Sequence, residues 1–269
     1  MKNFRTIRVS DPRFESNNLR FFTVKTPDLR GRGDCCVFAP PLLQADSSCP
    51  LIILLHGVYG SAWSWPLCTG VHLKVAALIN EGKLPPMVIA MPSDGLWGDG
   101  SAYLPHNEKN FENWIAEDIP EVIQQIIPAV TEESPLCISG LSMGGFGALR
   151  IGAKYGKKFS AIAAHSAITS LSQMSLFVEE DLANYKQEDE VDEDVFKTIF
   201  RYRDTLPPVY FDCGKDDLLI SYNRELHRQL KENGITHRYE EFEGEHQWNY
   251  WEEHIMDSLF FFRDRLSEL

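Results

Sequence analysis

Gly140-Leu141-Ser142-Met143-Gly144-Gly145 is the stretch of this chain that decides its fold. Residues 137–139 before it indicate the end of a buried strand, and residues 146–153 after it predict a helix. The turn between two such elements is strained, and glycines are needed because side chains beside the serine would collide with the strand or the helix. A serine on this turn stands exposed at the edge of the sheet, next to the N–H of Met143.

Apolar runs and helical patterns alternate along most of the chain. Helices are predicted where apolar residues recur every three or four positions, at 71–81, 114–127, 146–155, 222–232 and 247–266. Eight segments are predicted as strands, at 20–25, 35–38, 51–55, 87–91, 136–139, 159–164, 209–213 and 237–242. This alternation indicates an α/β fold, with a mostly parallel eight-stranded sheet covered by helices on both faces.

One acidic segment interrupts the alternation. It spans residues 169–205, follows the sixth predicted strand and carries most of its carboxylates between Glu179 and Asp194. We predict that it forms a small helical insertion over the carboxyl edge of the sheet, within a single domain spanning residues 1–269. Its charges are interpreted as a solvated face, because the segment lacks the glycine and the ligand spacing of a calcium-binding loop.

The overall composition limits the classes of partner. The formal charge of 26 − 39 = −13 and the pI near 5.1 argue against nucleic acid or an anionic membrane as a partner. We expect no signal peptide, because the first residues are polar, and no apolar run reaches the roughly 18 residues of a membrane span. The six cysteines lack C-x-x-C spacing, which favours free thiols in a reducing cytoplasm. The composition is compatible with a homo-oligomer.

The residues around Ser142 and downstream of it indicate nucleophilic chemistry. A serine hydroxyl needs a base within hydrogen-bond reach and an acid that orients the base. Asp217 follows the strand 209–213 and is the predicted acid, with Asp216 as the rival, and His246 on the glycine-bearing loop before the last helix is the predicted base. The developing oxyanion needs two N–H donors. We assign them to Met143 and Val58, with Gly57 as the alternative to Val58.

Other side chains at the predicted carboxyl edge are candidates for contact with a substrate. Aromatic residues gather on these loops, and a histidine ends the strand 159–164 at the same edge, which gives the set Trp63, Trp65, Trp97, Tyr103 and His165. His56 is interpreted as a structural hydrogen-bonding residue. Neither a phosphate loop nor a His-Glu-x-x-His motif occurs, and we predict neither a cofactor nor a metal.

These motifs together resemble the esterase D-type family of α/β-hydrolases. The family includes S-formylglutathione hydrolases, feruloyl and acetyl-xylan esterases, small-ester carboxylesterases and mycolyltransferases. The resemblance covers residues 20–265 and rests on the loop Leu-Leu-His-Gly-Val-Tyr-Gly with Trp65 after it, the turn at Ser142, Cys-Gly-Lys-Asp-Asp-Leu-Leu, and Gly-Glu-His-Gln-Trp-Asn-Tyr-Trp. It implies Asp217 as the acid, His246 as the base, and Met143 and Val58 as the oxyanion donors. Glu245 departs from the family pattern, which often has glycine there.

The sequence therefore predicts a serine carboxylic-ester hydrolase that acts on small to medium acyl esters. Acyl transfer and S-formylglutathione-type thioester hydrolysis are the alternatives, because both use the same acyl-enzyme. A non-catalytic binding protein on a hydrolase scaffold is disfavoured, because all three candidate triad residues are present.

Overall fold

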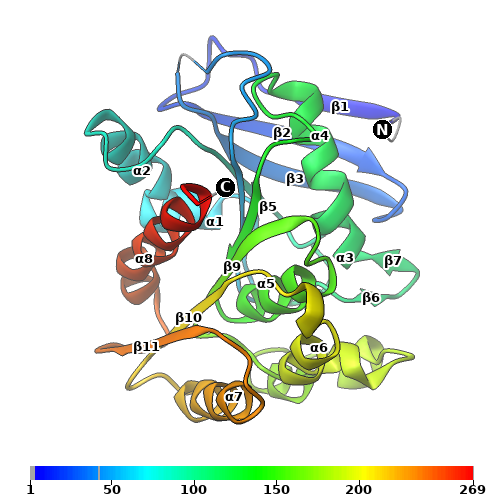
Figure 1. Cartoon of the computed structure of the whole chain (residues 1–269). Coiled ribbons are helices and arrows are strands. Elements are labelled where there is room, and N and C mark those ends of the chain that lie inside the picture. The colour runs from blue at the N-terminus through cyan, green and yellow to red at the C-terminus, as the bar shows by residue number, and fades with distance from the viewer. Residues whose placement is uncertain (1–3, 42, 269) are drawn as a thin grey trace.

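A computed structural model describes residues 4–41 and 43–268 of the chain. Its centre is a nine-stranded sheet with the strand order β1-β2-β3-β5-β4-β8-β9-β10-β11 (Figure 1). The strands are β1 (Thr6–Val9), β2 (Leu19–Thr26), β3 (Gly31–Phe38), β4 (Leu51–Leu55), β5 (Val88–Pro92), β8 (Leu136–Gly140), β9 (Phe159–His165), β10 (Val209–Gly214) and β11 (Arg238–Phe242). The strands β5, β4, β8, β9, β10 and β11 run parallel to one another. The strands β1, β2 and β3 at the other side of the sheet pair antiparallel with their neighbours.

The α/β fold with a mostly parallel sheet is confirmed, but the predicted count of eight strands is wrong. The additional strand is β1, which pairs with β2 at the edge of the sheet. All four of its residues are exposed or half-buried, so the apolar alternation that identifies a strand with one buried face is absent.

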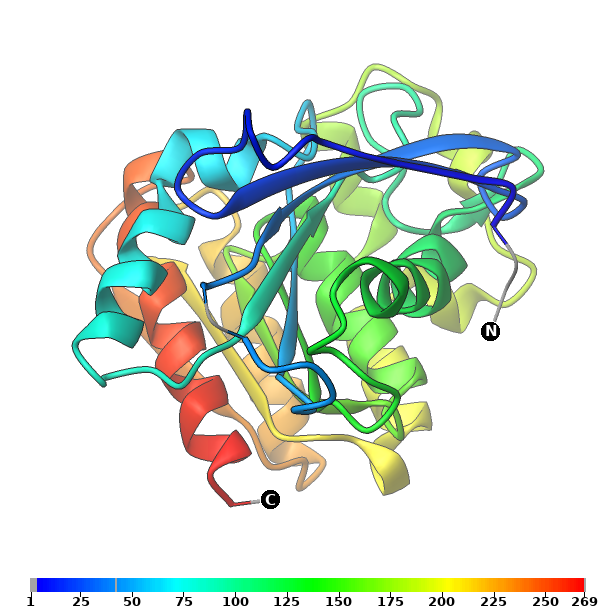
Figure 2. The same cartoon turned by 90° about the horizontal axis from the view of Figure 1, so that it is seen from above.

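Helices cover both faces of the sheet, as Figure 2 shows from above. One face carries α1 (Ser64–Thr69), α2 (Val71–Asn80) and α8 (Trp248–Leu266), and the other carries α4 (Ile119–Ile126), α5 (Met143–Lys154) and α6 (Val195–Arg201). Outside the acidic segment, the described residues also form the helices α3 (Phe111–Asn113), η1 (Trp114–Asp118, a π-helix) and α7 (Ile220–Glu232). A short hairpin joins β6 (Pro105–His106) to β7 (Lys109–Asn110).

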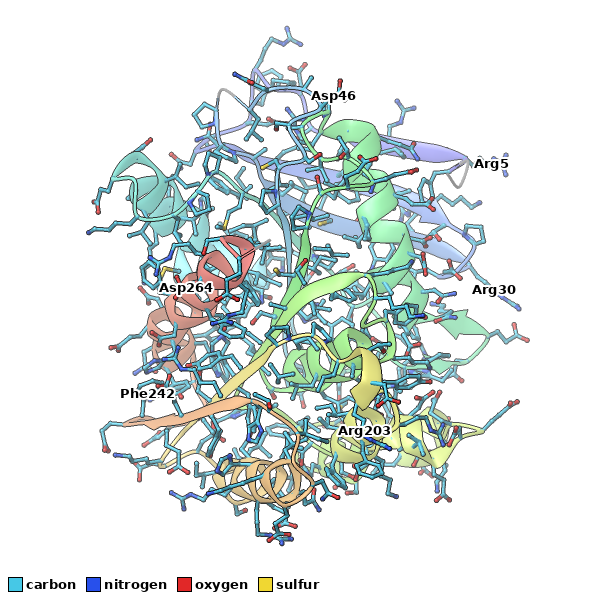
Figure 3. The ribbon with its side chains drawn as sticks, in the orientation of Figure 1. Arg5, Arg30, Asp46, Arg203, Phe242 and Asp264 are labelled. Atoms are coloured by element: carbon cyan, nitrogen blue, oxygen red, sulfur yellow. The ribbon has the colours of Figure 1, made fainter. Side chains whose placement is uncertain are left out.

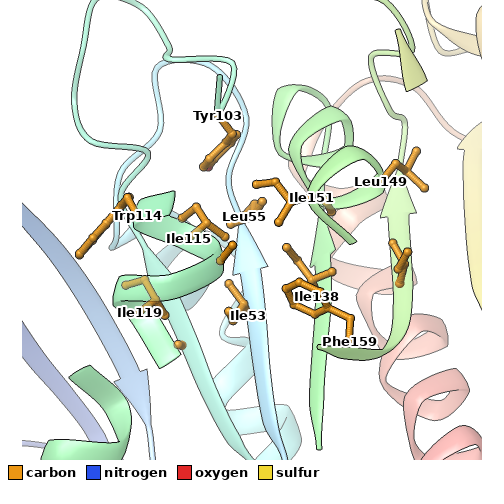
Figure 4. Close-up of a cluster of buried hydrophobic side chains, with 14 of the residues drawn as sticks. Ile53, Leu55, Tyr103, Trp114, Ile115, Ile119, Ile138, Leu149, Ile151 and Phe159 are labelled. Carbon is orange, nitrogen blue, oxygen red and sulfur yellow. The ribbon is translucent and has the colours of Figure 1, made fainter. Parts of the chain in front are cut away.

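Alternate side chains of the central strands fill two separate cores. Ile53 and Leu55 of β4 belong to the core under α4 and α5, whereas Ile52 and Leu54 point to the core under α8. Figure 4 shows the first of these cores, in which Ile53, Leu55 and Ile138 of the sheet lie among side chains of α4 and α5 and of η1. Exposed charged residues such as Arg5, Arg30 and Asp46 lie on the outside of the molecule (Figure 3).

The acidic segment 169–205 is largely helical. It contains the 3-10 helices η2 (Leu171–Leu176), η3 (Leu182–Tyr185), η4 (Glu190–Glu193) and η5 (Arg203–Thr205), together with α6. All six cysteines are free thiols, as predicted, and five of them are buried. Within the described residues, the structure has no helix of the length and apolar character that a membrane crossing requires.

Candidate active site

Ser142 lies on the turn between β8 and α5, where the backbone is strained. The residue is 2% exposed, so the expectation that the serine stands exposed at the edge of the sheet is wrong. Its backbone angles, φ of 54° and ψ of −118°, lie in a region that residues other than glycine rarely adopt. A Cβ on Gly140 would approach the Gly144 carbonyl oxygen to 2.2 Å, and one on Gly144 would approach the Leu55 carbonyl oxygen to 2.4 Å. The backbone N–H of Ser142 donates to the His165 carbonyl at 2.9 Å, which holds the turn against β9.

The structure brings three predicted site residues together at this turn. His246 Nε2 lies 3.0 Å from Ser142 Oγ, and His246 Nδ1 lies 2.9 Å from Asp217 Oδ2. Because an ionised carboxylate only accepts hydrogen bonds, Nδ1 carries the hydrogen and the lone pair of Nε2 faces the serine hydroxyl. His246 can therefore accept a proton from Ser142, and the Asp217 carboxylate can stabilise the resulting imidazolium.

Asp217 rather than Asp216 contacts the histidine. The Asp217 side chain is buried, and its Oδ1 also accepts the Leu219 N–H at 2.8 Å. Asp216 is exposed, and its backbone N–H donates to the Gly244 carbonyl at 3.0 Å. This bond holds the loop after β10 against the loop after β11, and it directs the next side chain, that of Asp217, toward His246.

The two predicted oxyanion donors flank the serine. A Cβ on Gly57 would lie 3.3 Å from Ser142 Cβ, so the loop after β4 passes directly beside the nucleophile. Among the described residues, neither the N–H of Val58 nor that of Met143 donates a hydrogen bond. Both donors are available to a ligand, and their assignment, with Gly57 as the alternative to Val58, stays a prediction.

Two aromatic residues that the sequence did not single out enclose His246. The Phe177 ring stacks on the imidazole with centroids 5.2 Å apart, and the Trp251 ring meets it edge-on at 5.0 Å. Trp251 belongs to the Gly-Glu-His-Gln-Trp-Asn-Tyr-Trp motif, so its spacing after His246 was an available signal. Phe177 follows a 3-10 helix in the acidic segment, where apolar residues show no periodicity that could identify it.

Residues 177–185, here called the cover segment, are tied to loops at the carboxyl edge. Tyr59 donates its hydroxyl to the Phe177 carbonyl, and the Asp99 N–H donates to Glu180 Oε1 at 2.9 Å. Tyr185 donates to the Gly100 carbonyl at 2.9 Å. Burial and the carboxylates of Glu180 and Asp99 raise the pKa of Tyr185, so its hydroxyl remains a donor. These bonds fix the cover segment, and with it the Phe177 ring on His246.

The structure corrects three of the predicted substrate contacts. Trp65 is 1% exposed, and its indole N–H donates to the Leu55 carbonyl at 3.0 Å. Tyr103 lies in the core shown in Figure 4, and its hydroxyl donates to the His56 carbonyl at 3.0 Å. His165 is fully buried and hydrogen-bonds to two other buried side chains, described below. The polar atoms of these three side chains bond protein partners in the interior, so we assign the three residues a structural role.

The other two predicted substrate contacts differ in exposure. Trp63 is 49% exposed, in the loop that follows β4 and precedes α1. Trp97 is half-buried and packs edge-on against His106 and Tyr185. Their contact with a substrate stays a prediction. His56 is buried and accepts the Asp94 N–H at 3.0 Å, which joins the loops after β4 and β5 and agrees with the expected structural role.

Within residues 4–41 and 43–268, no group of three or more His, Cys, Asp or Glu side chains is arranged to hold a metal ion.

Comparison with known proteins identifies the family. The chain belongs to the family described as "Putative esterase", whose sequence model matches residues 32–262. An acetyl esterase of Caldicellulosiruptor saccharolyticus is 30% identical over an alignment of 226 positions that covers 77% of this chain and 81% of that protein. These matches confirm the family that the motifs indicated, and the protein is an ester-hydrolysing enzyme.

Solved structures show the same fold. A ferulic acid esterase has a TM-score of 0.77 at 21% identity, over 96% of this chain and 99% of its own. An S-formylglutathione hydrolase from Agrobacterium tumefaciens also has a TM-score of 0.77, at 18% identity, over 98% of this chain and 100% of its own.

Proposed function

We propose that this enzyme is a serine carboxylic-ester hydrolase that uses Ser142, His246 and Asp217 to cleave small to medium acyl esters. The observation that carries the proposal is the continuous chain of hydrogen bonds from Ser142 Oγ through His246 to Asp217, at 3.0 and 2.9 Å. The family assignment supports ester hydrolysis, and the strained backbone at Ser142 supports its choice as the nucleophile.

Acylation begins when Ser142 Oγ attacks the ester carbonyl carbon and His246 Nε2 takes the hydroxyl proton. The carbonyl oxygen becomes an oxyanion, which the N–H groups of Val58 and Met143 stabilise where its charge develops. The bond to the alcohol oxygen then breaks, and the imidazolium returns its proton to the leaving alcohol. Asp217 keeps the imidazole in the required tautomer and balances its charge during the step.

Deacylation repeats these steps with water as the nucleophile. His246 Nε2 takes a proton from the water as it attacks the acyl-enzyme, and Ser142 Oγ leaves with that proton. An alcohol or thiol in place of water would give acyl transfer, and a thioester substrate would give the same acyl-enzyme.

Small acyl groups fit the enclosed surroundings of the nucleophile. Ser142 is only 2% exposed, and the Phe177 ring covers one side of His246. The acetyl esterase relative supports the same substrate size. We further propose that the chain works as one α/β-hydrolase domain in the cytoplasm, alone or as a homo-oligomer, because its free thiols suit a reducing compartment.

The test is hydrolysis of p-nitrophenyl acetate, butyrate, octanoate and ferulate by the wild type and by Ser142→Ala. We expect turnover of the short esters, and a loss of roughly 10⁴- to 10⁶-fold in kcat in the variant, because the nucleophile is removed. Ser221→Ala, at an exposed serine of α7, is the matched control and should retain wild-type turnover. Undiminished activity in Ser142→Ala would exclude the proposed mechanism.

A further inference from the structure

Four buried side chains form a second hydrogen-bonded chain near the candidate triad. Ser258 Oγ lies 2.8 Å from His165 Nε2, and His165 Nδ1 lies 2.8 Å from Asp212 Oδ2. The Tyr250 hydroxyl donates to the other carboxylate oxygen of Asp212 at 2.8 Å. Ser258, His165 and Asp212 are fully buried, and Tyr250 is 3% exposed. We call these four residues the buried network.

The buried network repeats the residue types of the candidate triad without offering a second reaction site. Its serine, histidine and carboxylate have no exposed surface, so a substrate cannot reach them. Their polar groups bond one another instead: Tyr250 and His165 Nδ1 donate to Asp212, and the Ser258 hydroxyl donates to His165 Nε2. A buried carboxylate with this many directed partners has one favourable arrangement, because any shift leaves an unpaired polar group in the interior.

The network joins the elements that carry the nucleophile and the acid. His165 ends β9, and its carbonyl accepts the N–H of Ser142 at 2.9 Å. Asp212 lies on β10, two positions before Gly214 ends the strand and opens the turn that holds Asp217. The Asp212 carbonyl also accepts the Ser166 N–H at 2.8 Å, which fixes β10 against the residue that follows β9.

The network also reaches the base through α8. Tyr250 and Ser258 both lie on this helix, which begins directly after the loop that carries His246 and packs against β9 and β10 (Figure 1). The Tyr250 ring packs directly against Gly244, because a Cβ added to Gly244 would lie only 2.7 Å from Tyr250 Cδ2. Trp251, the next residue, contacts the His246 ring. A shift of this helix turn would therefore move the imidazole.

We propose that the buried network is a positioning unit that sets the relative places of Ser142, Asp217 and His246 for catalysis. The inference rests on the proposed function. The three reacting groups come from three separate loops, and hydrogen bonds as short as theirs tolerate little displacement. The four side chains of the buried network bind the elements that support these three loops directly to one another.

Tyr250→Phe and Ser258→Ala test the proposal, because each removes one hydroxyl from the network and leaves the triad intact. We expect kcat for p-nitrophenyl acetate to fall about ten- to hundredfold in each variant while KM stays within about twofold, since binding contacts are unchanged and only the geometry is lost. The double variant should lose less than the product of the single losses, because the four residues act as one unit.

Thr26→Val is the matched control for loss of a buried hydroxyl. Thr26 on β2 is 1% exposed and donates to the buried carboxylate of Asp118, at the antiparallel side of the sheet. Its variant should lose thermal stability but retain kcat. Wild-type kcat in both network variants would overturn the inference, and so would an equal loss of kcat in Thr26→Val. Ser142→Ala, assayed in parallel, tests the proposed function separately, because that proposal fails if this variant remains active, whatever the network variants do.

Discussion

The two neighbouring aspartates after β10 differ in burial and partner although they are adjacent in sequence. Asp217 is buried against His246 Nδ1, whereas Asp216 is exposed. In Asp217→Asn the amide group can donate to Nδ1 and stabilise the wrong tautomer, so we expect kcat to fall by about 10⁴-fold. Asp216→Asn is the matched control and should remain close to wild type. Steady-state hydrolysis of p-nitrophenyl acetate measures both, and the reverse order would reassign the acid to Asp216.

At the scale of single residues, the sequence predicted which side chains meet but not which ones face the interior. Ser142, Asp217 and His246 follow parallel strands, whose carboxyl ends must share one edge of the sheet. The same argument misassigned His165. Its position at the end of β9 was correct, but the side chain turns inward to Asp212 and Ser258. The direction of a side chain depends on partners from distant elements, which position along the chain does not reveal.

At the scale of elements, the apolar patterns of the sequence were sufficient to predict the central strands and the longer helices. They failed at β1, whose residues lie at an edge with little burial, and in the cover segment, whose short 3-10 helix has no 3.6-residue period. The position of the cover segment depends on bonds from Tyr59, Asp99 and Gly100 on other loops. Such contacts follow from tertiary structure, so the role of Phe177 could not be predicted.

The cover segment leads to a prediction about acyl chain length. Phe177→Ala removes the ring that stacks on His246 and opens space beside the nucleophile. We expect the ratio of kcat/KM for p-nitrophenyl octanoate over acetate to rise roughly tenfold, because a larger apolar pocket accommodates the added methylene groups. Phe200→Ala, on α6 of the same acidic segment and 39% exposed, is the matched control. An unchanged chain-length profile in Phe177→Ala would mean that this ring does not limit the acyl site.

At the scale of the whole molecule, buried and half-buried histidines couple stability to pH. Burial lowers the pKa of His72, His106 and His237 from the ordinary value, so these side chains are neutral in the folded state at neutral pH. Below about pH 6.5 the unfolded chain binds more protons than the folded chain at these positions. Their contribution to the free energy of unfolding is therefore complete above the ordinary pKa, and it is lost as the pH falls through the lowered values.

His254 acts in the opposite direction, which makes the coupling testable by a pair of variants. Burial alone would lower its pKa, but the hydrogen bond to Asp257 and the carboxylate of Asp212 outweigh burial and raise it. His254 therefore stabilises the fold at pH values below its ordinary pKa, and that contribution is lost as the pH rises through the raised pKa.

We expect the decrease in Tm between pH 7 and 5 to become shallower in His72→Leu and steeper in His254→Gln. The Tm of each variant is compared with that of the wild type at the same pH. This comparison removes the effect of the overall charge, because the net charge of −13, counted with neutral histidines, is the same in all three proteins. Parallel Tm curves for all three proteins would show that neither histidine is coupled to folding.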